Sequence, residues 1–382
     1  MAFSGTGRGQ PRFDLAVIGA GIVGLGHALA AARQGLKVVV IDRDLRANGA
    51  SIRNFGFVTV SGQPRGEVWR LARRSRDIWA EVAPGAAIGI EHHGLVLTLR
   101  RPESVAVAEA FLATEMGEEC ELLTVAELKN RFPQIAADGA LGALFSPHEL
   151  RVESVTAVPR LTDWLAREHG VTFRTGETAL KAEPPIVATS RGEVLADRVV
   201  VCPNDDFSTL FPERIEAYQL RRCRLSMLRL ASPGFRWPAG VMSDLGLLRY
   251  RGYADLPQAQ TLARRIEVEQ PRALAHGVHL IAVQDADGSL VVGDSHHYDD
   301  LPPPFAPAEA EALILEEFQQ ATGLAAPPVI ARWTGVYPVS EQRPYVVDKP
   351  SPRVRLVIVT SGTGASTAFA IGEATIAELC GS

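Results

Sequence analysis

A glycine-rich turn between two apolar strands constrains the fold of this chain more than any other stretch. Residues 13–42 read FDLAVIGAGIVGLGHALAAARQGLKVVVID: a strand at 15–18, a turn, an Ala-rich helix ending near residue 35, and a strand at 37–41. The turn, residues 19–24, is a GxGxxG sequence, and Asp42 follows the second strand. Such a turn lets backbone approach a pyrophosphate, the helix N-terminus offers N–H groups to the phosphates, and the acid accepts hydrogen bonds from a ribose. The stretch therefore predicts a dinucleotide-binding unit.

Length, charge and cysteine pattern narrow the class of protein. A chain of 382 residues with 46% apolar residues is long enough to bury two cores, so two domains are expected. A net charge of −5 gives no basic field, which disfavours a nucleic-acid partner. The four cysteines lack metal-binding spacing and suit a reduced, cytoplasmic setting. No apolar run reaches membrane-spanning length, and residues 1–12 are expected to be a disordered lead-in without the apolar core of a signal peptide.

The loop after Asp42 is too long for a plain connection. Residues 43–66 are rich in Gly, Asn and Ser, and long loops of this kind often carry function. Ser51 and Asn54 can bond phosphate or ribose oxygens, Arg53 can face an anion, and Gln63 can reach a ring edge or the substrate. For each of them, an ordinary turn residue is the alternative. Residues 67–82 then have the apolar spacing of a helix, with arginines on its solvated face.

The middle of the chain changes pattern. Residues 87–100 suggest a strand pair with His92 and His93 at its turn, and adjacent histidines in a strand point to opposite sides, so a shared metal is not expected. A helix is expected at 102–117, and Thr124 begins a capping box that starts another.

Layered α/β structure is expected to resume with a long helix at 151–168 and strands at 171–174 and 196–202. The second of these strands ends in a small polar turn, Pro203-Asn204-Asp205, the kind of place where an α/β sheet meets its cofactor. Residues 216–230 alternate and lead into a second, largely antiparallel sheet. Later pieces of that sheet are expected at 278–283 and 289–293, before a helix at 308–322.

A second small-residue turn lies near the other end of the chain. Residues 361–367 read SGTGAST, between a strand at 356–360 and a helix at 368–379. Its N–H groups and small side chains let a ligand come close to the backbone. Asp42 alone would accept from the ribose of NAD or of FAD, but two such turns favour an extended FAD held at both ends.

Four ordered motifs together resemble the FAD-dependent amine and amino-acid oxidoreductases related to D-amino-acid oxidase, glycine oxidase and sarcosine oxidase. They are the opening turn with its acid, RVESVTAVPRLTDWLARE, WTGVYPVSEQRPYVV and SGTGASTAFAIGEATIAEL. The resemblance covers residues 13–380 and implies an α/β fold with a Rossmann-like, GR2-type FAD-binding domain and a second, antiparallel-sheet substrate domain (α+β). The implied boundaries are 13–86, 151–215 and 330–382 for the discontinuous FAD-binding domain, and 87–150 and 216–329 for the substrate-binding domain.

The resemblance also implies which residues contact the cofactor. The cysteine that tethers FAD in monomeric sarcosine oxidases has no counterpart next to Tyr337, so non-covalent FAD is expected. The expected FAD-binding residues are Gly19, Ala20, Gly21, Ile22, Val23, Gly24, Asp42, Arg43, Ser51, Asn54, Phe55, Ala179, Pro203, Asn204, Gly335, Arg343, Gly362, Thr363, Gly364, Ala365, Ser366 and Thr367.

Departures from the family pattern bear on the substrate. D-amino-acid oxidase and glycine oxidase hold the substrate carboxylate with the arginine of a GxRP motif, and Tyr337 stands there in GVYP, which argues against an ordinary α-amino acid held in that way. Residues 50–64, ASIRNFGFVTVSGQP, resemble a narrower subgroup associated with phosphonate catabolism. Arg53 is the leading candidate for the anion, because guanidinium forks suit a phosphonate dianion.

The other catalytic-pocket candidates are Gln63, Tyr250, His297 and Tyr337. Two of them have plain structural alternatives: Tyr250, with its neighbour Arg249, can be a packing residue at a sheet edge, and His297 can be an ordinary surface histidine.

The expected activity is that of an FAD-dependent oxidase of a small primary or secondary amine, with 2-aminoethylphosphonate or its N-methyl form as substrate. A hydride leaves the carbon beside the nitrogen, water cleaves the imine to an aldehyde (phosphonoacetaldehyde) and an amine or ammonia, and molecular oxygen takes the electrons to give H₂O₂. A glycine, sarcosine or D-amino-acid oxidase, a dehydrogenase serving another electron carrier, and a non-catalytic nucleotide-binding protein are the alternatives. No residue is clearly demanded as acid or base, and no metal and no membrane partner are expected.

Overall fold

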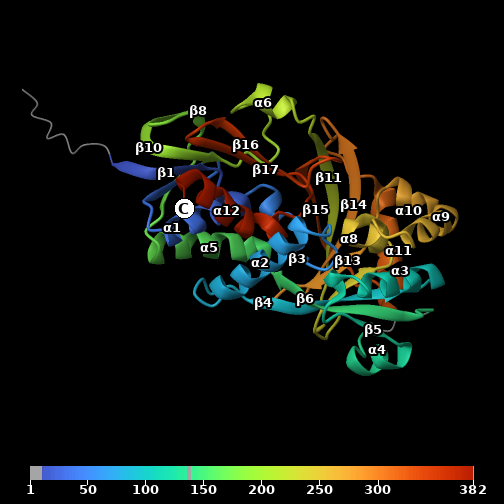
Figure 1. Ribbon diagram of the computed structural model, residues 1–382. Helices are drawn as coiled ribbons and strands as arrows, with labels where there is room; N and C mark the ends of the chain where they lie inside the picture. Colours follow the sequence, from blue (N-terminus) through green and yellow to red (C-terminus); the bar gives the residue numbers. More distant parts are fainter. Residues whose placement is uncertain (1–10, 136–138, 382) are drawn as a thin grey trace, which may run out of the picture.

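The computed structural model describes residues 11–135 and 139–381, which form two sheets lying side by side (Figure 1). The fold is mixed α/β as predicted, with one mainly parallel and one mainly antiparallel sheet. Of the predicted lead-in, residues 1–10 lie outside the described residues, and Arg12 already belongs to the first strand. No helix within the described ranges is both long and apolar enough to cross a membrane.

The first sheet is assembled from separate parts of the chain. Its strand order is β16-β17-β10-β1-β2-β7, and β8 and β9 form an antiparallel pair beside β10. Strands β17, β10, β1, β2 and β7 are parallel, and β16 is antiparallel to β17. The central strands are nearly continuous apolar runs because helices and loops cover both faces. The strands are β1 (Arg12–Ile18), β2 (Val38–Asp42), β7 (Thr172–Thr175), β8 (Ala179–Glu183), β9 (Ile186–Thr189), β10 (Gly192–Val201), β16 (Tyr345–Ser351) and β17 (Val354–Val359).

Helices gather on one face of this sheet (Figure 1). Helices α1 and α12 pack closely. A Cβ at Gly26 would lie 2.7 Å from the carbonyl oxygen of Ala368, and one at Gly372 would lie 2.7 Å from the backbone of Gly26. Glycine is therefore required at this crossing, which brings the two ends of the chain together. The helices of this face are α1 (Ile22–Arg33), α2 (Glu67–Val82), α5 (Ser154–Glu168) and α12 (Gly364–Cys380), and α6 (Pro212–Glu216) lies on the other face.

The second sheet has the order β15-β11-β14-β13-β12-β4-β6-β3, with β5 beside β6. Its pairs are antiparallel except for β12 with β4. Strands β3 and β15 of this sheet come from segments that the sequence assigns to the FAD-binding domain. The domain boundaries therefore stay a prediction. The strands are β3 (Phe57–Val58), β4 (Ile90–Leu99), β5 (Glu121–Leu123), β6 (Gly142–Val152), β11 (Arg221–Leu230), β12 (Gly240–Ser243), β13 (Ile281–Gln284), β14 (Leu290–Asp299) and β15 (Val329–Val339).

Several expected elements are confirmed. The helices predicted at 67–82 and 308–322 have those bounds, and the capping box at Thr124 begins a helix as expected. The helices around the second sheet are α3 (Pro102–Leu112), α4 (Val125–Arg131), α7 (Gly246–Arg249), α8 (Arg251–Ala254), α9 (Ala259–Glu269), α10 (Pro271–Ala275) and α11 (Ala308–Thr322).

Other expectations are wrong. Residues 87–100 contain one strand rather than a pair, because the Nε2 atom of His92 accepts a hydrogen bond from the backbone N–H of Gln284 at 2.7 Å, inside the sheet. His93 points the other way, to solvent. The long helix begins at Ser154 and not at Arg151, because Arg151 is still in β6, where it forms a buried ion pair with Asp285.

Three other boundaries also differ. Strand β14 continues past residue 293 to Asp299, the helix predicted at 102–117 ends at Leu112, and the last helix begins at Gly364 rather than at residue 368.

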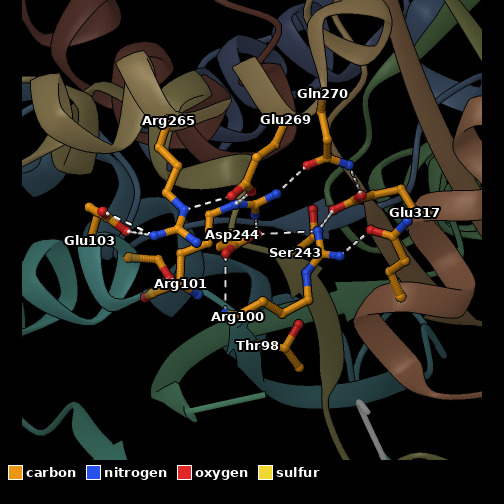
Figure 2. A network of polar contacts seen from close by, with 12 residues as sticks. Thr98, Arg100, Arg101, Glu103, Ser243, Asp244, Arg265, Glu269, Gln270 and Glu317 are labelled. Carbon is orange, nitrogen blue, oxygen red and sulfur yellow. Dashed lines mark hydrogen bonds and ion pairs between the residues drawn. The ribbon is translucent and has the colours of Figure 1, made fainter. Parts of the chain in front are cut away.

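A buried polar network fastens the second sheet to its helices (Figure 2). Asp244, which directly follows β12, is fully buried. Its Oδ1 accepts from Nη1 of Arg101 at 2.8 Å, and its Oδ2 accepts from the backbone N–H of Arg100 at 3.1 Å. The two guanidinium groups also reach Glu317 on α11 and Glu269 on α9, each at 2.7 Å. The network thus links the end of β4 to the end of β12, through Asp244, and to α9 and α11, through the two arginines.

Candidate active site

The first part of the site lies where the parallel strands end. A cavity, called here the nucleotide cavity, opens at the carboxyl ends of β1, β2 and β10, the position where open α/β sheets bind ligands. The Oδ2 atom of Asp42 accepts from the backbone N–H of Ala20 at 2.6 Å, and its Oδ1 accepts from that of Asp44 at 2.8 Å. The carboxylate is thereby fixed beside the glycine turn, where it lines the cavity.

The glycine turn is shaped for close approach of backbone. A Cβ at Gly24 would lie only 1.8 Å from the carbonyl oxygen of Gly19, so the turn can close onto α1 only with glycine there. The Ser51 hydroxyl accepts from the N–H of Ile22 at 2.9 Å and ties the long loop to the start of α1. The first turn of α1 has no acidic residue, so no side-chain carboxylate competes for its N–H groups. These features fit a pyrophosphate-containing cofactor.

A second cavity, called here the central cavity, continues from the first. The two cavities share Gly21, Ala50, Ser51, Cys202 and Asn204, so together they form one elongated space. The central cavity is lined by both glycine turns, at 21–24 and 361–366, and by Gly335 of β15. An extended dinucleotide that enters the nucleotide cavity can therefore reach both ends of the chain.

Most of the residues predicted to bind FAD line one of these two cavities, and three do not. Ala20 contributes its N–H to Asp42, and Thr367 is buried and donates to the carbonyl of Thr363 at 3.0 Å. Arg343 lies in an adjoining cavity, called here the vestibule. The lining residues are Gly19, Gly21, Ile22, Val23, Gly24, Asp42, Arg43, Ser51, Asn54, Phe55, Ala179, Pro203, Asn204, Gly335, Gly362, Thr363, Gly364, Ala365 and Ser366.

The second sheet supplies the far wall of the central cavity. Tyr337 of β15 is buried, and its hydroxyl accepts from Nη2 of Arg249 at 3.2 Å. Burial raises the pKa of Tyr337 well above its ordinary value, so the phenol stays protonated. Tyr250, which follows α7, completes an aromatic and cationic wall with them. This wall can receive the anionic end of a small molecule.

The predicted pocket residues fall into different places. Tyr250 and Tyr337 lie in that wall, and Arg53 also lines the central cavity, where its Nη2 donates to Asn48 at 3.1 Å. Gln63 is buried, donates to the hydroxyl of Thr59 at 2.7 Å and lines the vestibule. His297 lines none of these cavities: its Nε2 lies 3.1 Å from Nδ1 of His276, because alternation along β14 turns it away from the cavity.

Four polar residues of the cavity wall are not among the site residues predicted from the sequence: Arg249, which the sequence suggests only as a packing residue, and His279, Asp294 and His296. The Oδ1 atom of Asp294 lies 3.3 Å from Nδ1 of His279 and 3.8 Å from Nδ1 of His296, and all three side chains are buried. For Asp294 and His296 the cause is the predicted end of the strand at residue 293. Extending the strand alternation would have placed Asp294 and His296, two residues apart, on one face.

Burial sets the protonation of this cluster. It raises the pKa of Asp294 to about 8, against the opposing effect of the Arg249 charge. Burial, reinforced by Arg249, lowers the pKa of His279 to about 3 and that of His296 well below its ordinary value. At neutral pH both imidazoles are therefore neutral, and Asp294 is the titratable group of the cluster closest to neutrality.

Comparisons with known proteins agree with this arrangement. Residues 14–378 match the family model described as FAD dependent oxidoreductase (DAO). The chain is 25% identical over 202 residues to monomeric sarcosine oxidase from Bacillus sp. (strain B-0618), an alignment that spans about half the length of each protein.

Two solved structures share the fold. Glycine oxidase from Bacillus cereus has a TM-score of 0.77 at 17% identity, over 97% of this chain and 95% of that one. L-proline dehydrogenase from P. horikoshii has a TM-score of 0.75 at 16% identity, over 96% and 93%. At such low identity these likenesses speak for the fold alone.

Proposed function

The chain belongs to the family of FAD-dependent oxidoreductases, and we propose on that premise that it oxidises a small amine carrying an anionic group. The observation that carries this proposal is that two arginines, Arg53 and Arg249, line the central cavity. Two arginines match the charge of a dianionic group better than they match the single charge of a carboxylate. The substrate that we propose is 2-aminoethylphosphonate or its N-methyl form.

The anionic end of the substrate would bind the wall made by Arg249, Tyr250 and Tyr337. Arg249 is partly buried, and its Nε has no hydrogen-bond partner among the described residues, so donors remain for a ligand. The Tyr337 hydroxyl already accepts from Arg249 and can donate its own proton onward to an anion. We therefore propose Arg249 as an anion ligand in addition to Arg53.

The cofactor would lie in the joined nucleotide and central cavities. Asp42 would hold a ribose, the N-terminus of α1 the pyrophosphate, and Gly335 with the 361–366 turn the ring system. When bound, FAD supplies the two-electron acceptor that the protein itself lacks. The chain's own work is to hold the reacting carbon against that acceptor and to exclude water with Tyr250 and Tyr337.

We propose that FAD is held without a covalent bond. Cys202 is the cysteine that lines both cavities, and burial raises the pKa of its thiol well above the ordinary value, which disfavours the thiolate needed for attachment. The four cysteines are free thiols, in keeping with a reduced, cytoplasmic setting.

The test is a panel of amines under anaerobic conditions. 2-Aminoethylphosphonate, its N-methyl form, glycine, sarcosine and a neutral alkylamine are mixed with the flavin-loaded protein, and loss of flavin absorbance is followed. The proposal expects the phosphonates to react fastest. Faster bleaching by glycine or sarcosine would favour the corresponding amino-acid oxidase, and hydrogen peroxide formation in air would separate an oxidase from a dehydrogenase serving another carrier.

A substitution tests the anion site itself. Arg249→Met should raise KM for a phosphonate amine by at least about 30-fold, because losing a buried charged partner costs about 2–5 kcal/mol. Arg53→Ala tests the second guanidinium in the same way. The control is Arg272→Met, because its exposed side chain pairs with Glu309 and neither residue lines the three cavities. An equal increase in KM for the phosphonate amine and for a neutral amine would count against the anion site.

A further inference from the structure

One oxygen atom of a buried carboxylate in the wall of the central cavity has no hydrogen-bond partner among the described residues. Asp294 is 3% exposed, lines the cavity, and its Oδ1 has no hydrogen-bond partner among the residues that the structure describes. Burying an unsatisfied carboxylate is costly, so a group of this kind in a cavity wall is a candidate for binding or catalysis. A ligand in the central cavity can supply the missing hydrogen-bond partner.

Among the described residues, the permanent charge that acts on the pKa of Asp294 is that of Arg249. Arg249 approaches from α7, while His279 and His296 flank the carboxylate as neutral imidazoles. The Nδ1 atom of His296 lies 3.0 Å from the carbonyl of Gly277, and we assign the ring proton to this contact. The titratable and charged groups that act on Asp294 are Arg249, Tyr250, His279, His296, Cys223 and Tyr298.

A metal ion is the competing occupant, because one ligand atom from each of His279, Asp294 and His296 lies within 4.8 Å of the others. Two features oppose it. The nitrogen of His296 nearest to Asp294 already faces a carbonyl as a donor, and a protonated nitrogen cannot ligate a metal. The Arg249 cation also repels a divalent ion from the same corner about twice as strongly as it repels a singly charged ammonium group. The geometry fits a cationic N–H donor better.

We infer that Asp294 is a catalytic residue that takes a proton from the substrate ammonium group before the neighbouring C–H bond is broken. This inference rests on the proposed function. In this step one N–H bond of the ammonium breaks, an O–H bond forms on Asp294, and the electron pair stays on nitrogen. Nothing is oxidised until the C–H bond breaks.

The chemistry favours the carboxylate over its neighbours as the acceptor. An alkylammonium group has a pKa of about 10, and the buried imidazole of His279, with a pKa of about 3, is too weak a base to take its proton efficiently. Asp294, with a pKa of about 8, is far better matched. Arg249 would hold the anion at one side of the wall and Asp294 the amine at the other, which selects a zwitterion.

The test compares wild type with Asp294→Asn, which keeps the shape but cannot accept a proton. The rate of anaerobic flavin reduction by saturating amine should rise with pH in the wild type and then level off. In the variant it should fall by about 10²- to 10⁴-fold and lose that rise. Ser295→Ala is the control, since the neighbouring buried side chain lies on the other side of β14 and should leave rate and profile unchanged.

A measurement independent of turnover accompanies it. Infrared difference spectra between pH about 6 and about 10 should contain a protonated-carboxyl band in wild type that Asp294→Asn lacks. If Asp294→Asn does not fold, the wild-type profile decides, and a reduction rate that does not vary with pH overturns the inference.

The remaining outcomes separate the two proposals. A variant as fast as wild type, with the same pH profile, overturns the role of Asp294 and leaves the amine oxidoreductase standing. A stoichiometric metal in wild type that is lost in Asp294→Asn overturns it in favour of a metal site. A wild-type flavin that no amine reduces overturns the proposed function, and the role of Asp294 with it.

Discussion

Replacing Asp244 by alanine should destabilise the protein strongly, because it removes the shared acceptor of the buried network in Figure 2. Arg100 and Arg101 would keep their charges in a site where Asp244 is fully buried. Removing one partner of a buried ion pair costs about 3–5 kcal/mol. The entropy of unfolding is about 2.1 cal/mol/K per residue, which gives about 0.8 kcal/mol/K if all 382 residues unfold as one unit. Dividing the lost free energy by this entropy, we expect the melting temperature to fall by about 4–6 °C.

The matched control is Asp255→Ala. Asp255 also pairs with an arginine, Arg251, at 3.2 Å, but both side chains are more than half exposed. Exposed pairs of this kind are worth about 0–1 kcal/mol, so its melting temperature should change by about 1 °C or less. Differential scanning calorimetry on the flavin-loaded proteins measures both. Equal shifts for the two variants would show that Glu317 and Glu269 compensate the two arginines and would refute the reasoning.

Three other predictions concern the cofactor and the cluster around Asp294. Asp42→Ala should lower FAD affinity by about 10- to 100-fold, because hydrogen bonds to a charged group contribute about 1.5–3 kcal/mol, and unchanged flavin retention on gel filtration would contradict the ribose role. Removing FAD should lower the melting temperature, and adding FAD should restore it whereas adding NAD should not, since a ligand that binds only the folded state stabilises it. The free energy of unfolding should fall as pH rises from about 6.5 to about 8. In this range folded Asp294, with its pKa raised to about 8, holds a proton that the unfolded chain has released. His279 and His296 have lowered pKa values, so they change the free energy of unfolding only below pH about 6.5. Denaturant unfolding across this range should show a flatter profile for Asp294→Asn, and an unchanged slope would argue against the raised pKa.

The nucleotide half of the site could be predicted from the sequence because its determinants are local. The turn at 19–24 and the acid at 42 lie within one β-α-β unit, and the periodicity of 30 residues is enough to place them. The structure adds only the contacts that hold them, such as the bond from the N–H of Ile22 to Ser51. A local pattern with a mechanical reason for each residue leaves little for tertiary packing to overturn.

The substrate wall could not be predicted in the same way, because it is made of side chains from elements distant in the sequence. Arg249 ends a helix of four residues, too short to show a helical period. Asp294 lies beyond the point where the apolar run of β14 ends, although the strand itself continues. Residue type alone does not tell which of two adjacent histidines faces inward, so the prediction names His297 although His296 lines the cavity.

The contact between the two halves has a consequence for how they act. A Cβ at Gly362 would lie 2.9 Å from the ring of Tyr337, so the second glycine turn packs directly against the substrate wall. Gly362 also has a φ of +73°, which a larger residue adopts only with strain. The turn proposed to hold the flavin and the tyrosine proposed to hold the substrate therefore cannot move independently. A change at Gly362 must displace both, so it should alter cofactor retention and amine selectivity together, whereas Asp42, at the far end of the nucleotide cavity, should affect retention alone.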